Sequence, residues 1–108
     1  LYDRTFKPVT DLGSDFMKAA RDQDYEAAYD MGTSSFQLEI ESPGGLGEFL
    51  TMNDFIPTSW SFTNTSIENS SASMQGTATL DNGSKVRFTL YFVKGTDDWK
   101  ISSVSIHN

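Results

Sequence analysis

The sequence predicts an α+β fold in which N-terminal helices pack on one face of a four-stranded antiparallel sheet. Apolar residues recur at helical spacing up to about Asn53 and alternate with polar residues from about Thr58. All predicted helices therefore precede all predicted strands, whereas parallel βαβ units would interleave them. The 108 residues suit one domain, so we expect a single domain over 1–108, with a helical half over about 8–56 and a sheet half over about 58–107.

The first two predicted helices have clear end signals. Pro8 suits the first turn of a helix, because its missing N–H would have no intrahelical partner there. Asp24 is placed to cap a second helix that carries Tyr25 and Tyr29. Gly32 suits the end of this helix, where a left-handed conformation favours glycine. The apolar stripe of the first helix consists of Val9, Leu12, Phe16, Ala19 and Ala20.

The segment from Phe36 to Ile40 fits two periods. Phe36, Leu38 and Ile40 alternate as they would in a strand. Phe36 and Ile40 are also four residues apart, as on one face of a helix. Periodicity alone leaves this segment open.

A glycine-rich stretch, Gly44–Gly47, precedes a short helix expected over 46–52. A dinucleotide-binding fingerprint would need a glycine where Leu50 stands, and no Lys-Ser or Lys-Thr pair follows for a P-loop. We therefore expect a flexible loop that could form a mobile lip over a pocket. Pro57 then closes the helical half.

Four runs of alternating residues form the predicted sheet. The first run places Trp60 and Phe62 on one face, and Ile67 extends the run or marks a bulge. Asp81–Ser84 predicts a hairpin, because its Asn-Gly pair tolerates the positive φ angles of a type I′ turn. A second turn is expected over 95–98. The inward positions of the second and third runs are Ala72, Met74, Ala78, Leu80, Val86, Phe88, Leu90 and Phe92.

The last predicted strand runs from Trp99 to Ile106. Its inward positions change from odd to even numbers between Ile101 and Val104. This change predicts a bulge or a change of twist at Ser102 and Ser103.

Composition excludes several classes of function. The chain has 8 basic and 15 acidic residues, so its net charge of -7 repels polyanions, and we expect no nucleic-acid partner. No stretch approaches the ~18 apolar residues needed to span a bilayer, so this segment is not expected to insert into a membrane. The absence of cysteine excludes a disulfide, a thiolate nucleophile and a zinc–sulfur site. We expect no cofactor.

No metal site or catalytic triad is expected. His107 is the only histidine, and its place near the end of the sequence suggests a solvated side chain. The pairs Asp22 with Asp24 and Asp97 with Asp98 lack the spacing of a calcium loop. Asp24 is better explained as a helix cap, and the second pair as part of a turn.

Two motifs resemble a known family. Asp24–Tyr29 reads D-Y-E-A-A-Y, and Trp99–Ile101 reads W-K-I. With Phe16 upstream and the strand pattern between them, these motifs resemble small NTF2-like domains of the cystatin-like fold, over nearly the whole chain. The resemblance implies a curved sheet wrapped on a helix, often with a pocket between them. It also implies an extracytoplasmic setting of the bacterial type, with an anchor or signal upstream of Leu1.

The best candidates for a ligand pocket lie on the predicted helices and first strand. Asp15 adjoins the apolar stripe of the first helix and could act as a general base if an apolar cavity surrounded it. Tyr25, Tyr29 and Trp60 could form aromatic walls. The simpler interpretation pairs Asp15 with Lys18 in solvent and places the aromatic residues in the core.

The opposite face of the predicted sheet is polar. Trp60 and Trp99 could stack on a sugar, but both lie at inward positions, which favours the core. The outward positions suit solvent or a protein partner. They are Ser73, Gln75, Thr77, Thr79, Arg87, Thr89 and Tyr91.

The sequence favours a binding module over an enzyme. Because no catalytic constellation is present, we expect a non-enzymatic, extracytoplasmic accessory or sensor module that binds a protein partner or a small apolar ligand. The alternative is a small pocket enzyme of isomerase, dehydratase or cyclase type with Asp15 as general base. Self-association into a homodimer through a sheet face or edge is a further expectation.

Overall fold

The computed structural model describes residues 2–52, 54–95 and 98–107, with side chains from Pro8 onward in those ranges. It contains an antiparallel sheet and helices that all precede it in the chain, as predicted. The helices are α1 (Tyr2–Arg21), α2 (Tyr25–Asp30), α3 (Ser34–Ile40) and α4 (Pro43–Met52). The strands are β1 (Pro57–Glu68), β2 (Ser71–Leu80), β3 (Lys85–Lys94) and β4 (Trp99–His107).

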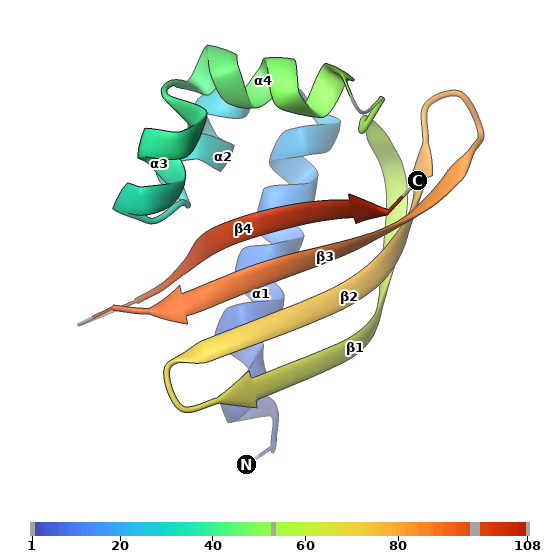
Figure 1. Ribbon diagram of the computed structural model, residues 1–108. Coiled ribbons are helices and arrows are strands. Elements are labelled where there is room, and N and C mark those ends of the chain that lie inside the picture. The colour runs from blue at the N-terminus through green and yellow to red at the C-terminus, as the bar shows by residue number, and fades with distance from the viewer. Residues whose placement is uncertain (1, 53, 96–97, 108) are drawn as a thin grey trace.

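The sheet is a four-stranded antiparallel meander in the order β1-β2-β3-β4. Figure 1 shows a curved sheet with α1 crossing behind it, while α2, α3 and α4 gather beyond β4. The α+β prediction, with helices packed on one face of a curved sheet, is confirmed. Both β1 and β4 are edge strands, and β4 is the edge that faces the three short helices.

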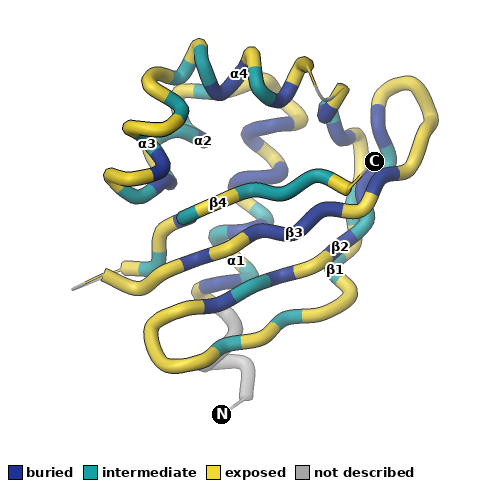
Figure 2. The backbone as a smooth tube through the Cα atoms, in the orientation of Figure 1, coloured by how far each residue is buried: buried dark blue, intermediate teal, exposed yellow. Residues whose placement is uncertain are grey.

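The core lies between α1 and the inner face of the sheet. The predicted inward positions of β2 and β3 are all buried, and Figure 2 shows the buried positions along these two central strands. Phe88 lies at the centre of an aromatic cluster, with edge-to-face contacts to Phe55 at 5.9 Å and to Phe62 at 6.0 Å between ring centroids. The two tryptophans, Trp60 and Trp99, are half-buried and pack against this core.

The first helix begins earlier than predicted. α1 starts at Tyr2, so Pro8 lies inside the helix rather than in its first turn. The ring of Pro8 holds φ near the helical value, so the helix can continue through it, although one backbone hydrogen bond to the turn before is lost. Downstream of Pro8 the predicted stripe is confirmed, since Val9, Phe16 and Ala20 are fully buried.

The end of α2 is anchored to the last strand. Asp24 caps α2 as predicted, because its carboxylate accepts a hydrogen bond from the backbone N–H of Ala27 at 3.4 Å. The prediction of a left-handed Gly32 is wrong: this glycine forms a parallel bridge with Ile101. It is needed for close packing, since a Cβ there would lie 2.2 Å from the ring of Phe36.

The segment 36–40, for which the sequence allowed a strand or a helix, is helical. Thr33 caps α3, and its hydroxyl accepts a hydrogen bond from the backbone N–H of Phe36 at 3.0 Å. The spacing of Phe36 and Ile40 is therefore the informative pattern, because both side chains lie on the face that meets α4 and β4.

The glycine-rich stretch is helical, so the prediction of a flexible loop and mobile lip is wrong. α4 begins at Pro43, which suits a first helical position, and the Ser42 hydroxyl accepts a hydrogen bond from the N–H of Gly45 at 3.1 Å. A Cβ at Gly47 would lie 2.6 Å from the ring of Tyr25. These glycines permit close contact between α4 and its neighbours, which outweighs their low helix propensity.

Bulges adjust both edge strands. In β1, Thr63 is not paired with a residue of β2, because Phe62 pairs with Gly76 and Asn64 with Gln75. Thr63 is therefore a bulge, and Ile67 extends the strand beyond it. Pro57 is the first residue of β1, whereas we had expected it only to end the helical half.

The bulge predicted in β4 is confirmed at Ser102. Tyr91 of β3 pairs with Ser103, and the next residue, Phe92, pairs with Ile101. One residue of β4 is therefore left between two consecutive pairs, which accounts for the change from odd to even inward positions.

The hairpin between β2 and β3 is confirmed, but its turn type is not I′. Asn82 has no positive φ; only Gly83 does, at +88°. The N–H of Gly83 donates to the carbonyl of Leu80 at 3.0 Å, and the N–H of Leu80 donates to that of Ser84 at 2.8 Å. This is a three-residue loop closed by a left-handed glycine.

The second hairpin also lies where it was expected. The N–H of Gly95 donates to the carbonyl of Asp98 at 2.9 Å. Asp97 lies outside the described residues.

Candidate functional site: an apolar pocket with an acidic rim

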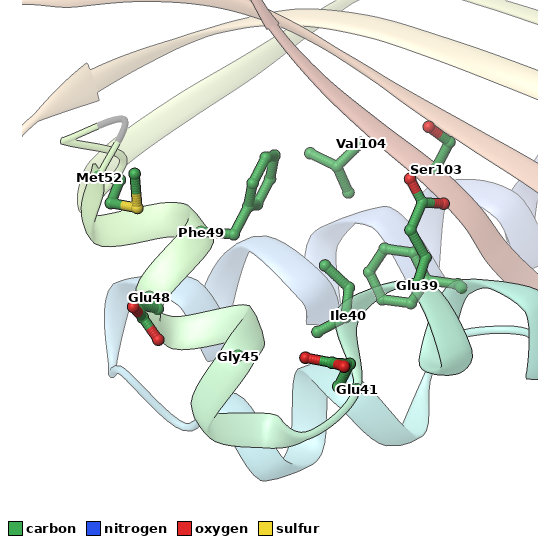
Figure 3. Close-up of a pocket in the computed structure, with 10 residues that line it drawn as sticks. Glu39, Ile40, Glu41, Gly45, Glu48, Phe49, Met52, Ser103 and Val104 are labelled. Atoms are coloured by element: carbon green, nitrogen blue, oxygen red, sulfur yellow. The ribbon is translucent and has the colours of Figure 1, made fainter.

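A pocket of about 420 Å³ lies between α3, α4 and β4. Figure 3 shows Phe49 of α4 and Val104 of β4 pointing toward one another across it. Its apolar wall consists of Phe36, Ile40, Phe49, Met52 and Val104. Its polar residues are Glu39, Glu41, Glu48 and Ser103.

The pocket follows from the spacing of residues on α4. Gly45, Glu48, Phe49 and Met52 all line it, and they recur in steps of three and four residues, which places them on one helical face. Met52, at the edge of the pocket, is 80% exposed although its side chain is apolar. The pocket is therefore an open apolar surface rather than a closed core.

The rim of the pocket is negatively charged. Glu39, Glu41 and Glu48 are exposed carboxylates, and Figure 3 shows all three around the apolar side chains. From Asp22 to Ser84 the sequence contains no Lys or Arg. The basic residues therefore belong to α1, β3 and β4, and the charged side chains of α2, α3 and α4 are all carboxylates.

The sequence analysis missed this site, although two signals for it were present. The first is the helical interpretation of Phe36 and Ile40. The second is the uneven distribution of charge, which the whole-chain value of -7 conceals.

None of the four predicted pocket residues lines this pocket. Asp15 is an exposed residue of α1. Tyr25 and Tyr29 are half-buried on α2, and the hydroxyl of Tyr29 donates to the backbone carbonyl of Glu41 at 3.4 Å. A general base at Asp15 would need an apolar cavity around it, whereas the Asp15 side chain is exposed on α1.

Trp60 contacts a cation of the protein itself. The guanidinium of Arg21 lies 5.7 Å from the centroid of the Trp60 ring, within the range of a cation–π contact. Arg21 also forms a 3.0 Å ion pair with Asp22, and this hydrogen bond lowers the pKa of the Asp22 carboxyl. One face of the Trp60 ring is thereby covered and is not free to stack on a sugar.

The Tyr25 hydroxyl is buried and has no hydrogen-bond partner in the described part of the chain. A buried hydroxyl without a partner costs about 1–3 kcal/mol. We therefore expect Tyr25→Phe to raise the free energy of unfolding by about 1 kcal/mol. Urea denaturation followed by circular dichroism measures this change, and Tyr29→Phe, which removes a bonded hydroxyl, is the control. A loss of stability in Tyr25→Phe would contradict the assignment.

A smaller pocket of about 200 Å³ lies beside Arg87, Thr89 and His107. His107 is exposed but not frayed, because it lies in β4 paired with Arg87 of β3, and its Nε2 lies 3.0 Å from the hydroxyl of Thr89. Thr89 is only 4% exposed, although the alternation had assigned it to solvent. No three potential metal ligands cluster among the described side chains.

Comparisons with known proteins agree with this architecture. The sequence matches no protein-family model, and no curated protein is similar to it in sequence. A DUF4783 family protein from Bacteroides ovatus is 16% identical, with a TM-score of 0.64 over 85% of this chain and 90% of that one. Aln2 from a Streptomyces species is 14% identical, with a TM-score of 0.65 over 97% of this chain and 90% of that one.

A third similar structure is Rd1NTF2_05, a designed NTF2-like protein in a substituted form. It is 14% identical, with a TM-score of 0.66 over 96% of this chain and 99% of that one. The chain has an NTF2-like fold. At these identities the likeness establishes the fold of this NTF2-like protein alone, and its function has to be argued from its own site. No helix in 2–52, 54–95 or 98–107 is long and apolar enough to cross a membrane.

Proposed function

We propose that this NTF2-like protein is a non-enzymatic binding module whose pocket between α3, α4 and β4 takes a ligand with an apolar body and a cationic group. The observation that carries the proposal is the combination of an apolar wall with three carboxylates at its rim. The extracytoplasmic setting, as an accessory or sensor part of an anchored protein, is also proposed. It rests on the sequence resemblance, and fractionation of native cells tests it.

Two physical effects support an amphipathic cation as the ligand. Apolar surface removed from water contributes about 25 cal/mol per Å², and the wall of Phe36, Phe49 and Val104 offers such surface. Each rim carboxylate attracts a cation by about 1 kcal/mol at 4 Å in a fully water-like medium, and by more where water is excluded. An anionic ligand of the same shape meets the same wall but is repelled by the rim.

The test compares two ligands that share a phenyl ring and an alkyl chain and end in groups of opposite charge. We expect 4-phenylbutylamine to bind and 4-phenylbutyrate not to bind, as measured by chemical-shift changes at Phe49 and Val104. The triple variant Glu39→Gln, Glu41→Gln, Glu48→Gln is expected to weaken amine binding by roughly tenfold or more at low salt.

A matched control removes carboxylates from the same group of helices, α2, α3 and α4, but from positions outside the pocket. Glu26 and Asp30 are exposed on α2 and do not line the pocket. The double variant Glu26→Gln, Asp30→Asn should therefore bind the amine almost as the parent does. If neither ligand shifts these resonances, or if both bind equally, the proposal fails.

A further inference from the structure

Within the described residues, the outer edge of β4 has unpaired backbone groups beside the pocket. Because the N–H of Leu80 donates to the carbonyl of Ser84, the even-numbered residues of β3 direct their backbone groups toward β2. The odd-numbered residues then bond to β4, where Thr89 pairs with Ser105. The residues on either side of Ser105 therefore direct their N–H and C=O groups away from β3.

These two residues, Val104 and Ile106, form an open edge. Among the described residues, the backbone hydrogen bonds to the outer side of β4 are those of Ile101, whose N–H donates to the Met31 carbonyl and whose carbonyl accepts from the Thr33 N–H, both at 2.9 Å. Val104 and Ile106 are half-buried, and an edge with unpaired backbone groups is a template for another strand.

The open edge and the pocket adjoin one another. The side chain of Val104 lines the pocket, and Figure 3 shows it facing Phe49. Cross-strand neighbours point their side chains to the same face of a sheet. A residue of an added strand opposite Val104 would thus direct its side chain to the pocket side of the sheet.

We propose that the ligand of the pocket is an extended segment of a partner protein, which adds a fifth strand to the sheet at Val104–Ile106. This inference rests on the proposed function and names its ligand. The segment has an apolar residue for the wall of Phe49 and Ile40, flanked by Lys or Arg whose long side chains reach the rim carboxylates. Main-chain hydrogen bonds supply affinity and the pocket supplies specificity.

Charge argues against a second copy of this chain as the occupant. Two β4 edges paired with one another would bring two sets of Glu39, Glu41 and Glu48 together, and like charges disfavour that pairing. The other edge, β1, starts at Pro57 and has bulges at Thr58 and Thr63, features that blunt an edge against pairing.

The test uses the acetylated and amidated peptide Lys-Val-Lys-Phe-Lys-Val-Lys. We expect it to bind the protein and to slow the hydrogen exchange of the Val104 and Ile106 amides by at least roughly tenfold, because both N–H groups gain a partner. The Ser105 amide is already bonded to β3 and serves as the internal control. Sedimentation of the peptide-free protein reports whether a second copy occupies the edge instead.

Two isomeric peptides test the backbone pairing itself. One peptide carries backbone N-methyl groups on its three apolar residues. The other carries them on its first three lysines. The two peptides therefore have the same charge and the same side chains. Only alternate N–H groups of a strand face its neighbour, so one isomer should lose most of its binding while the other retains it.

Three outcomes overturn the inference. They are equal binding of both isomers, unchanged exchange of the Val104 and Ile106 amides, and a peptide-free dimer paired through β4. If 4-phenylbutylamine still binds in any of these cases, the proposed function stands without the added strand. If neither the amine nor the peptide binds, the proposed function fails as well.

Discussion

Gly45→Ala is expected to destabilise the protein by about 3 kcal/mol, because the new methyl group has no space. A Cβ at this position would lie 2.2 Å from the backbone carbonyl oxygen of Ile40, at the end of α3. This oxygen belongs to the main chain and cannot rotate away as a side chain could. The link between α3 and α4 contains Glu41 at φ +79°, so its backbone already has an unusual conformation and little freedom to adjust.

The preceding residue provides the control. Gly44 belongs to the same turn of α4, but a Cβ there would meet only the Ser42 hydroxyl oxygen, at 3.7 Å. Gly44→Ala should therefore stabilise the protein by about 0.5–1 kcal/mol through helix propensity. Urea denaturation of both variants measures the difference. Similar stabilities for the two variants would mean that α4 does not approach Ile40 as described.

Phe88→Ala is expected to cost about 3–5 kcal/mol, the range for deletion of a large side chain from a packed core. Phe88 is 1% exposed and joins Phe55, which follows α4, to Phe62 of β1 through two edge-to-face contacts. Removal of this ring leaves a cavity between β1, β3 and the segment after α4. Against a typical total stability of about 5–15 kcal/mol, the loss is large enough to unfold a marginal protein.

Tyr91→Ala on the same strand is the control for Phe88→Ala. Tyr91 is 41% exposed on the opposite face of β3, so its removal should change stability by about 0.5 kcal/mol or less. Phe88→Leu extends the test if Phe88→Ala does not fold, because it keeps much of the apolar volume and should lose less. Equal losses in Tyr91→Ala and Phe88→Leu would contradict the central position of Phe88.

The strands were predictable because their signals are local. The alternation in β2 and β3 identified their buried apolar side chains but assigned the buried Thr89 to solvent, and the shift between Ile101 and Val104 located the bulge at Ser102. Helix boundaries were less predictable. The glycines of α4 resemble a loop in isolation, and their place in a helix depends on close packing, of Gly45 against the Ile40 carbonyl and of Gly47 against Tyr25.

The candidate site was less predictable than the fold. A pocket formed by α3, α4 and β4 requires knowledge of which elements meet, and no local pattern brings Phe36 next to Val104. Asp15 adjoins the apolar stripe of α1 in the sequence, but consecutive residues of a helix point in different directions, so Phe16 is buried while Asp15 faces solvent. The distribution of charge along the chain predicts the site better, since it distinguishes the acidic helices α2, α3 and α4 from the elements that carry Lys and Arg.

The bridge between Gly32 and Ile101 has a consequence for the order of folding. It joins residues 69 positions apart (101 minus 32), whereas each pair of adjacent strands is joined by a short turn. Closing such a long loop costs more entropy than closing a hairpin, so the meander can assemble by local steps before this contact forms. We therefore expect α2 and α3 to dock after the meander has formed, so that the pocket takes shape late in folding.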